Sequence, residues 1–509
     1  MAEPLFAISI PPRLNLATHV LDARLAEGLG ARDALVTDER RVTYAQLADE
    51  TNRVANVLCA MGVTRGDRVL IALPDGVPFI AAALATLKAG GVVTMANPEL
   101  PPADYAAHLE YTRARVLVTD TALAGRAASE LAGVPALVVG DGYEARVAAA
   151  SPRFDAVDTA ADEPAIWIAT SGSTGRPRAA VHAHRTFAFS IEAYAKGVLG
   201  LGPSDVTLSV PKLYFGYATG MSFLFPLSVG ATAVLFPERP TPERLFQLAE
   251  RHRPTVLALV PTLIAKLLAA TPAEAQRRAL AGARVATSAG EALPEPLHAR
   301  WLEAFGVEIL EGLGSAELFH IHVSNRRGDA RPGWLGRVVP GYEARVVRDD
   351  GTDAPDGEIG ALWVRGGSAA LGYEGDPERT AQVFRRDGDW VATSDKVRRE
   401  DGRFHFEGRS DDMLKVGGIY VSPLEVESVL LQHPAVSECA VVAYEDETGL
   451  VKPKAVVVWR AGADTPARFD ELDAFARARL AAFKVPRRWE ALPALPRNDR
   501  GKLVRRSLR

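Results

Sequence analysis

Residues 165–178 read Ala-Ile-Trp-Ile-Ala-Thr-Ser-Gly-Ser-Thr-Gly-Arg-Pro-Arg. The first five are apolar and predict a buried strand, and the next six, Thr170–Gly175, are all glycine, serine or threonine. Glycines let the backbone approach an anion, and hydroxyls together with backbone N–H groups can donate to phosphate oxygens. The alternative is a flexible surface loop, but such a loop seldom follows a buried strand directly and precedes basic residues. The stretch therefore predicts a strand that ends in a polyphosphate-binding loop.

The chemistry of this loop differs from that of the common nucleotide-binding loops. The pattern Gly-x-x-x-x-Gly-Lys-Ser/Thr does not occur here, which disfavours a P-loop kinase or ATPase.

Lys and Arg number 59 against 63 Asp and Glu, so the net charge of -4 provides no global basic field for a polyanion such as duplex DNA. We therefore expect phosphate chemistry to be local and expect no nucleic-acid partner.

Outward from the loop, short apolar strands alternate with helical stretches. Strands are expected over 69–73, 92–95, 115–118 and 136–139, and helices over 77–89 and 122–131, with the same pattern again over 206–251. Near Asp401 the character changes, and the last hundred residues read as a small α+β unit with helices over 423–432 and 468–482 and strands over 436–443 and 454–458. The predicted fold class is α/β. A large N-terminal domain of packed mixed β-sheets with helices covers residues 1–408, and a small mobile α+β domain covers residues 409–509.

Composition narrows the class of protein further. Hydrophobic residues make up 48% and charged residues 24% of the 509 residues, which is typical of a folded protein with a large core. Cys59 and Cys439 are the only cysteines, so a disulfide framework, a thiolate zinc site and an iron–sulfur cluster are improbable. No signal peptide is recognisable and no run of about 18 apolar residues occurs. We expect a soluble, cytoplasmic protein that does not enter a membrane.

These motifs resemble the adenylate-forming enzymes, which comprise acyl-CoA and aryl-CoA ligases, peptide-synthetase adenylation domains and luciferases. Their phosphate loop reads Thr-Ser-Gly-Thr-Thr-Gly-x-Pro-Lys-Gly, which residues 170–179 match except for Arg178 in place of lysine and Ala179 in place of glycine. Residues 314–317 match the family's Gly-x-Thr-Glu with Ala316 in place of threonine, and Leu313 stands where the family has tyrosine. Further matches follow the family's order at 41–47, 87–98, 393–395, 408–418 and 496–503.

The resemblance implies an enzyme that uses ATP, Mg²⁺ and coenzyme A. A carboxylate attacks the α-phosphorus of ATP, pyrophosphate leaves, and the acyl-adenylate then passes its acyl group to a thiol. Charge accumulates on phosphate oxygens in the first step, so cations and backbone dipoles should dominate catalysis. The residues implied to bind the nucleotide or coenzyme are Thr170, Ser171, Gly172, Ser173, Thr174, Gly175, Arg178, Gly290, Glu311, Gly312, Leu313, Asp395, Arg409, Gly417 and Gly418.

Four further residues receive individual roles from the resemblance. Glu317 is implied as the Mg²⁺ ligand, and Lys502 as the lysine that spans the α-phosphate and the acyl carboxylate in the first half-reaction. Lys415 is implied to assist thioester formation, and Asp411 to be the hinge about which the small domain rotates between the two half-reactions. Taken alone, Glu317 and Lys502 could each be a solvated charge, and Lys415 is nearly as well explained as a lysine on a surface strand.

The acid-binding segment is expected at residues 211–220, where aromatic and small residues alternate. Together with residues 311–325 it closely resembles the benzoate-CoA ligase subgroup. The residues implied to line or flank a flat aryl slot are Tyr214, Phe215, Tyr217, Ala218, Gly314, His320 and Ile321. Two His-x-His pairs, at 182/184 and 320/322, bring neither a cysteine nor a third nearby histidine, so we do not expect them to bind a metal.

The leading interpretation is an ATP-dependent aryl-CoA ligase that acts on benzoate or on an amino- or hydroxybenzoate. One alternative is an aryl-acid adenylating enzyme that loads the phosphopantetheine arm of an acyl carrier protein. An alternative from another class is a non-catalytic adenylate-binding or partner-docking protein, against which Glu317, Asp395, Arg409 and Lys502 argue. The expected partner is a small aromatic carboxylic acid, and the chain is expected to be a monomer or homodimer.

Overall fold

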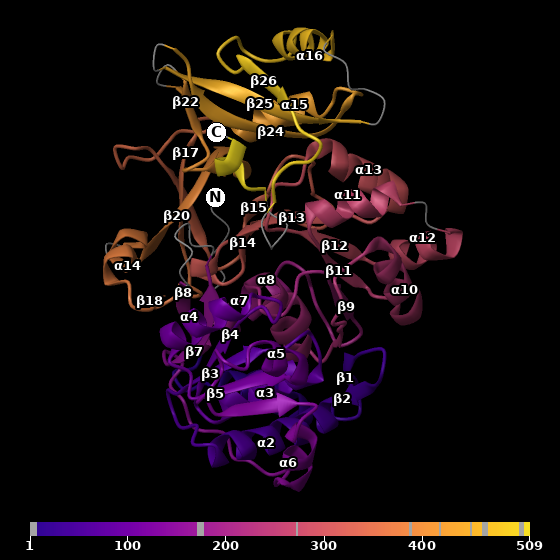
Figure 1. Ribbon diagram of the computed structural model, residues 1–509, viewed down its shortest axis with the longest axis vertical. Helices are drawn as coiled ribbons and strands as arrows, with labels where there is room; N and C mark the ends of the chain where they lie inside the picture. Colours follow the sequence, from indigo (N-terminus) through magenta and orange to yellow (C-terminus); the bar gives the residue numbers. More distant parts are fainter. Residues whose placement is uncertain are drawn as a thin grey trace.

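The computed structural model describes residues 8–170, 178–270, 273–385, 389–416, 419–447, 450–460, 467–497 and 503–508. The N-terminal part builds sheets that are layered with helices, and the C-terminal residues form two small sheets with their own helices at the opposite end of the molecule (Figure 1). Ser171, Gly172, Ser173, Thr174, Gly175, Gly417, Gly418 and Lys502 lie outside the described residues.

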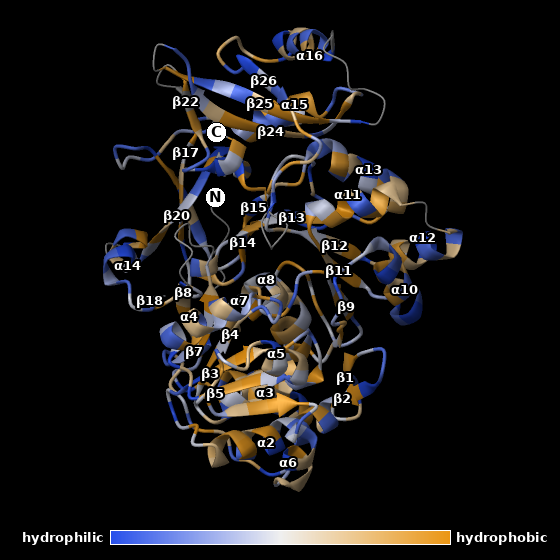
Figure 2. Ribbon diagram, in the orientation of Figure 1, coloured by the Kyte–Doolittle hydropathy of each residue, from blue (hydrophilic) through white to orange (hydrophobic). Residues whose placement is uncertain are grey.

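The first large sheet has seven strands in the order β18-β8-β7-β4-β3-β5-β6. Strands β3 to β7 run parallel, while β8 and β18 join antiparallel at one edge. Figure 2 shows β3 and β5 as largely hydrophobic, as expected of parallel strands that are buried on both faces. The strands are β3 (Arg68–Ala72), β4 (Val92–Met95), β5 (Val116–Asp120), β6 (Ala136–Val139), β7 (Pro164–Ala169), β8 (Ala179–Ala183) and β18 (Gly372–Tyr373).

Helices of the N-terminal residues pack beside this sheet. The helix α3 is apolar around nearly its whole circumference, and all but one of its residues are buried. A capping box formed by Thr43 and Gln46 starts α2. These helices are η1 (Thr18–Asp22), α1 (Ala23–Ala26), α2 (Tyr44–Ala60), α3 (Val77–Lys88), α4 (Pro102–Thr112), α5 (Thr121–Arg126) and α6 (Tyr143–Ala149).

The second large sheet has nine strands in the order β15-β14-β13-β12-β11-β9-β10-β1-β2. Its central strands are parallel, and β2, β14 and β15 are antiparallel additions at the edges. The strands are β1 (Asp33–Val36), β2 (Arg41–Thr43), β9 (Val206–Ser209), β10 (Thr232–Val234), β11 (Val256–Leu259), β12 (Val285–Ser288), β13 (Ile309–Gly314), β14 (Ile321–Ser324) and β15 (Arg337–Val338). The helices between them are α7 (His184–Ser190), η2 (Ile191–Lys196), α8 (Gly216–Ala218), η3 (Thr219–Leu224), α9 (Phe225–Ser228), α10 (Pro242–His252), α11 (Pro261–Ala269), α12 (Glu274–Ala281), α13 (Glu295–Phe305) and η4 (Ala316–Leu318).

A third sheet follows, and then the C-terminal unit. The third sheet contains β16 (Glu343–Val347), β17 (Gly360–Arg365), β19 (Phe384–Arg385), β20 (Trp390–Glu400) and β21 (Arg403–Arg409), with α14 (Pro377–Val383) beside it. The C-terminal unit contains β22 (Leu414–Val416), β23 (Ile419–Val421), β24 (Val436–Glu445), β25 (Val451–Trp459), β26 (Arg488–Ala491), α15 (Pro423–Leu430), α16 (Ala467–Arg477) and η5 (Arg505–Leu508). A hydrophobic core of its own holds the C-terminal unit together.

The fold class expected from the sequence is confirmed, while several element boundaries were wrong. The helices expected to end at 131, 432 and 482 end at Arg126, Leu430 and Arg477, because irregular turns replace their last residues. The change of character near Asp401 is a turn between β20 and β21 of one sheet, where Asp401 and Gly402 both adopt positive φ. Among the described residues, no helix combines the length and the apolar character needed to cross a membrane.

Candidate active site

The phosphate loop predicted from the sequence leaves β7 and returns into β8. Its two flanks are fixed to each other, because the backbone N–H of Thr170 donates to the carbonyl oxygen of Arg178 over 2.8 Å. The guanidinium of Arg178 lies 3.6 Å from a carboxylate oxygen of Asp376 and 5.9 Å from the centre of the Tyr373 ring. The sequence interpretation did not include Asp376 or Tyr373, because neither belongs to a motif that it used.

Glu317 lies in η4, directly after β13, and other segments hold it from two sides. Tyr373 donates a hydrogen bond of 2.6 Å from its hydroxyl to Oε1 of Glu317, and the N–H of Ala370 donates to the carbonyl oxygen of Glu317 over 2.9 Å. His182 on β8 donates from Nε2 to the carbonyl oxygen of Ala316 over 2.7 Å. The structure thereby brings the Glu317 turn against the strand that follows the phosphate loop.

A strained turn separates Glu317 from His320. Phe319 has φ 65° and ψ -56°, and the N–H of His320 donates to the carbonyl oxygen of Leu318 over 2.8 Å. These values define a classic γ-turn, which is rare and costs backbone strain. The turn reverses the chain, so that Gly314 on β13 pairs with Ile321 on β14. The candidate metal ligand Glu317 and the candidate acid-binding residues His320 and Ile321 therefore lie within one stretch of five residues.

His320 is buried among aromatic rings. Its ring lies 5.2 Å from Tyr194, 5.5 Å from Tyr217 and 4.6 Å from Phe225, measured between ring centres. Nε2 lies 3.2 Å from the carbonyl oxygen of Tyr217, which can only accept, so Nε2 carries the proton and Nδ1 is an acceptor. Burial lowers the pKa of His320 to about 3, which keeps the ring neutral at physiological pH.

The other expected acid-site residues of the segment 211–220 lie close to Tyr217 in the sequence, and Tyr217 contacts His320. Ala218 is fully buried, and the hydroxyl of Tyr217 lies 2.5 Å from Oγ1 of Thr287 on β12. Tyr214 and Phe215 are half-buried, and their ring centres are 4.6 Å apart. Gly220 allows close packing here, because a Cβ at that position would lie 2.5 Å from the His320 ring.

Glycines also shape the β13 side of the site. A Cβ on Gly312 would lie 2.7 Å from the Ile321 side chain, and one on Gly314 would lie 2.8 Å from the carbonyl oxygen of His320. Ile321 itself is buried. The structure therefore brings Gly312, Gly314, His320 and Ile321 together, while Leu313 between the two glycines is half-buried.

Glu311 is a buried acid on the same strand. Its Oε1 accepts a hydrogen bond of 2.9 Å from the N–H of Leu293, which follows Gly290 in the loop after β12. Burial raises the pKa of Glu311 to about 8, and the bond from Leu293 only partly opposes this shift. Gly290 has φ 89°, and the space beside its missing Cβ is open. Ser288, the last residue of β12, pairs with Glu311 on the parallel strand β13, so the loop that contains Gly290 begins beside Glu311.

Asp395 and Arg409 lie opposite each other on β20 and β21. Asp395 is buried, whereas Arg409 is exposed and donates to the hydroxyl of Ser394. Asp411 follows in a turn in which the N–H of Asp412 donates to the carbonyl oxygen of Arg409 over 2.9 Å. Lys415 is in β22 and pairs with Tyr420 of β23. The backbone therefore joins the expected ribose, hinge and thioester positions in one continuous stretch.

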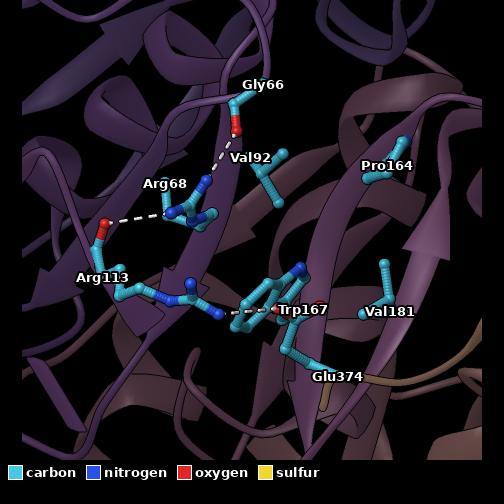
Figure 3. A pocket seen from close by; sticks show the side chains of 8 residues that line it. All are labelled: Gly66, Arg68, Val92, Arg113, Pro164, Trp167, Val181 and Glu374. Atoms are coloured by element: carbon cyan, nitrogen blue, oxygen red, sulfur yellow. Dashed lines mark hydrogen bonds and ion pairs between the residues drawn. The ribbon is translucent and has the colours of Figure 1, made fainter. Parts of the chain in front are cut away.

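A separate pocket of about 310 Å³ lies on the outer face of the seven-stranded sheet (Figure 3). Arg68, Trp167 and Glu374 are among the residues that line it, and Arg113 reaches toward Glu374 with 3.9 Å between the charged groups. Trp167 and Ile168 are successive on β7 and therefore point to opposite faces. Ile168 packs close to Gly216, so the pocket lies on the face away from the expected acid-binding segment, residues 211–220.

The described residues contain no group of three His, Cys, Asp or Glu side chains that could hold a metal ion by themselves. In the first of the two histidine pairs, Nε2 of His182 contacts the Ala316 carbonyl, and Nδ1 of His184 accepts from the N–H of Leu16. Mg²⁺ commonly uses one or two carboxylates together with substrate phosphates and water. A single carboxylate at Glu317, beside the flanks of a phosphate loop, fits that donor set.

Comparison with known proteins finds one enzyme family along most of the chain. Residues 23–374 match the family described as AMP-binding enzyme, and residues 425–502 match the AMP-binding enzyme C-terminal domain. The chain is 42% identical to the benzoate–CoA ligase of Thauera aromatica over an alignment of 518 positions, which covers 99% of this chain and 97% of the relative. A solved benzoate CoA ligase from Burkholderia xenovorans is 39% identical with a TM-score of 0.89, covering 97% of this chain and all of the other. The anthranilate CoA ligase AuaEII, solved with anthranoyl-AMP, is 35% identical with a TM-score of 0.92, covering 98% of this chain and 97% of that one.

Proposed function

Because the chain belongs to the AMP-binding enzyme family, we propose that it is an AMP-forming aryl-CoA ligase for benzoate or a small amino- or hydroxybenzoate. The enzyme converts the acid and ATP to an acyl-adenylate and pyrophosphate. The thiol of coenzyme A then attacks the acyl carbonyl, the new C–S bond forms, AMP leaves, and the thiol proton passes to solvent.

One observation carries the proposal. The γ-turn at Phe319 places Glu317 and His320 on the two sides of one reversal of the chain. The Glu317 turn is held by His182 on β8, the strand into which the phosphate loop returns, and by Tyr373 on β18 beside it. His320 is fixed by the carbonyl oxygen of Tyr217 and lies beside the Tyr217 ring, within the expected acid-binding segment. A nucleotide site and a flat apolar site that meet at one turn are what joining a carboxylate to the α-phosphorus requires.

In the first half-reaction we assign the polyphosphate to residues 170–175 together with Arg178. Glu311, Gly312, Leu313 and Gly290 are assigned to the adenine, and Asp395 and Arg409 to the ribose hydroxyls. Asp395 can accept from both hydroxyls because it carries two carboxylate oxygens, and Arg409 donates to the same sugar. Lys502 is assigned to the reacting carboxylate and α-phosphate, where an ammonium group stabilises the developing negative charge.

Mg²⁺, when bound, neutralises charge on the phosphate oxygens and holds them in a fixed orientation. Glu317 is the residue we assign as its ligand. Tyr373 holds Oε1 of that carboxylate, and His182 and Ala370 hold the backbone on either side of its Cα. The chain therefore presents the carboxylate in a preset orientation, so that little reorganisation is needed when the phosphates arrive.

For the second half-reaction we assign residues 409–509 as a small domain that turns about Asp411. The turn would remove Lys502 from the adenylate and bring Lys415, Gly417 and Gly418 toward the path of the pantetheine thiol. Support comes from the sequence matches at these positions and from the separate hydrophobic core of the C-terminal unit. We also assign the enzyme to the cytoplasm, acting as a monomer or homodimer.

The chemistry of the aryl slot favours acids with a hydrogen-bond donor on the ring. Nδ1 of His320 is buried and, within the described part of the chain, has no hydrogen-bond partner. Since Nε2 is occupied as a donor, Nδ1 can accept from a ring amino or hydroxyl group. Such a partner would compensate the cost of burying an unpaired polar atom.

The proposal is tested by ATP–pyrophosphate exchange with a panel of acids. The panel contains benzoate, 2-aminobenzoate, 3- and 4-hydroxybenzoate, acetate and decanoate. We expect exchange with the aryl acids to exceed that with acetate and decanoate by at least about a hundredfold, because an apolar slot gains roughly 25 cal/mol per Å² of ring surface buried. Preference for decanoate would contradict the aryl assignment, and no exchange with any acid would favour the non-catalytic alternative. Comparison of coenzyme A with a holo carrier protein as acceptor distinguishes the ligase from a carrier-loading enzyme.

A further inference from the structure

A lysine and an aspartate, from loops that follow strands of different sheets, meet in the interior at the start of the aromatic segment, residues 211–220. Lys212 follows β9 of the nine-stranded sheet, and Asp75 lies between β3 and α3 of the seven-stranded sheet. Their side chains are only 13% and 4% exposed, and Nζ of Lys212 lies 3.9 Å from Oδ2 of Asp75. Lys212 lies within the expected acid-binding segment, residues 211–220, but was assigned no role there, and Asp75 lies in no motif that the sequence predicted.

Lys212 is bound to its own sheet by a second contact. Its Nζ donates a hydrogen bond of 2.7 Å to the carbonyl oxygen of Phe236, which follows β10, and lies 3.8 Å from the centre of the Phe236 ring. The ammonium group is therefore held between a carbonyl, an aromatic face and a carboxylate. Through Lys212, the start of the aromatic segment is fixed to both large sheets.

Asp75 holds the backbone of the same segment. Its Oδ1 accepts a hydrogen bond of 2.9 Å from the N–H of Leu213, while the carbonyl oxygen of Leu213 accepts one of 2.9 Å from Oγ1 of Thr219. Leu213 and Thr219 bracket the five residues from Tyr214 to Ala218. The peptide groups of Leu213 are thus fixed in both directions, which sets where these five residues lie.

Stability alone does not explain a buried pair of this kind. Burial raises the pKa of Asp75 to about 6 and lowers the pKa of Lys212, so desolvation outweighs the attraction between the two groups. Well-packed apolar residues generally stabilise a fold as well as a buried ion pair does. What the pair adds is a specific arrangement, because Asp75 accepts from the N–H of Leu213 while the neighbouring Lys212 is held by the carbonyl of Phe236.

We propose that Asp75 and Lys212 are positioning residues for the aryl acid, which act by fixing the backbone from Leu213 to Thr219. The inference rests on the proposed function, because it takes Tyr214–Ala218 as the acid-binding segment. It predicts that loss of the pair loosens the aryl slot while the phosphate and adenine contacts, which come from other segments, stay intact.

The test uses the full chain and measures KM for benzoate and for ATP by pyrophosphate exchange. Asp75→Asn removes the charge but keeps an oxygen that can accept from Leu213, whereas Asp75→Ala removes both. Lys212→Met keeps the length and apolar stem of the side chain and removes the ammonium group. The matched control is Asp205→Ala, because Asp205 precedes the other end of β9, is 7% exposed in its side chain, and pairs with Arg284 over 2.8 Å.

We expect Asp75→Ala to raise KM for benzoate at least about tenfold and Asp75→Asn to raise it less, with KM for ATP changed by less than about twofold. Lys212→Met should raise KM for benzoate in the same selective way. Asp205→Ala should lower the melting temperature, but it should not raise KM for benzoate more than KM for ATP. If Asp75→Ala does not fold, Asp75→Asn and Lys212→Met give the same comparison.

Unchanged KM for benzoate in the folded variants would overturn the inference, and so would equal rises in KM for benzoate and ATP. Either result with a wild-type enzyme that activates aryl acids leaves the proposed function intact. A wild-type chain that activates no aryl acid would overturn the proposed function and, with it, this inference.

Discussion

Tyr373 donates a hydrogen bond of 2.6 Å to Oε1 of Glu317, across 56 residues of sequence. Tyr373 lies on β18 at the edge of the seven-stranded sheet, and Glu317 follows β13 of the nine-stranded sheet. Burial and the neighbouring Glu317 carboxylate raise the pKa of Tyr373, so its hydroxyl stays protonated and remains a donor. The carboxylate of Glu317, the candidate Mg²⁺ ligand, is therefore held by a side chain of the seven-stranded sheet, although Glu317 itself follows a strand of the nine-stranded sheet.

Replacing Tyr373 with phenylalanine tests this relationship. Loss of the donor leaves Glu317 free to rotate, so we expect the Tyr373→Phe variant to need about five- to tenfold more Mg²⁺ for half-maximal pyrophosphate exchange. KM for benzoate should stay within about twofold. Binding of Mn²⁺ to the ATP-loaded protein, followed by electron paramagnetic resonance, should weaken by a similar factor. Tyr44→Phe is the control, because it removes a buried tyrosine hydrogen bond of 2.7 Å to the Ala231 carbonyl. Equal effects of both changes would contradict the positioning role.

Enlarging Ala218 tests the aryl slot. Ala218 is fully buried, so the larger side chain of Ala218→Phe must displace the groups that pack around it. We expect kcat/KM for 2-aminobenzoate and 4-hydroxybenzoate to fall at least about tenfold further than that for benzoate. KM for ATP and the melting temperature, measured on the same preparation, report on general damage. An unchanged ratio among the three acids would remove Ala218 from the slot.

The pH dependence of stability reports on Glu311. Burial raises its folded pKa to about 8 from an ordinary value near 4.5, so the folded state favours the neutral acid. That contribution to stability is fully present below the unfolded pKa and is lost as the pH rises through about 8. Glu311→Gln cannot ionise, so its melting temperature should fall less than that of the wild type between pH 6 and pH 9. Parallel curves for the two proteins would show that Glu311 is ionised throughout this range.

Lys502 provides a test that separates the half-reactions. We expect Lys502→Ala to reduce adenylate formation at least about a thousandfold, because the ammonium group stabilises charge only in that step. Thioester formation from benzoyl-adenylate supplied ready-made should stay within about threefold of wild type. Lys452→Ala is the charge-matched control, since it removes another lysine of the C-terminal unit, one that lies 3.8 Å from Asp446. Equal loss in both half-reactions would contradict the rotation of residues 409–509.

Local pattern was enough to predict the elements that surround the site. The strand β4 begins and ends at the residues expected, and α3 differs from the expected helix by one residue. Both are continuous apolar runs bounded by glycine or a polar turn, so their neighbours in sequence carry the signal. The ends of α5 and α16 were wrong because helix termini depend on tertiary contacts as well as on local propensity.

The sequence by itself determined the family, the order of strands and helices around the phosphate loop, and the kinds of residue available for chemistry. Each of these depends on residues that are neighbours in the sequence, and the spacing of such residues directly constrains the local backbone. Only the tertiary structure decided which distant residues meet: Tyr373 with Glu317, Asp75 with Lys212, and His320 with the carbonyl of Tyr217. Such pairs arise where segments far apart in the sequence pack together, and no local periodicity specifies which side chains will then lie close to one another. The acceptor state of His320 Nδ1 and the raised pKa of Glu311 follow from that packing, because burial and the geometry of the partner groups set them.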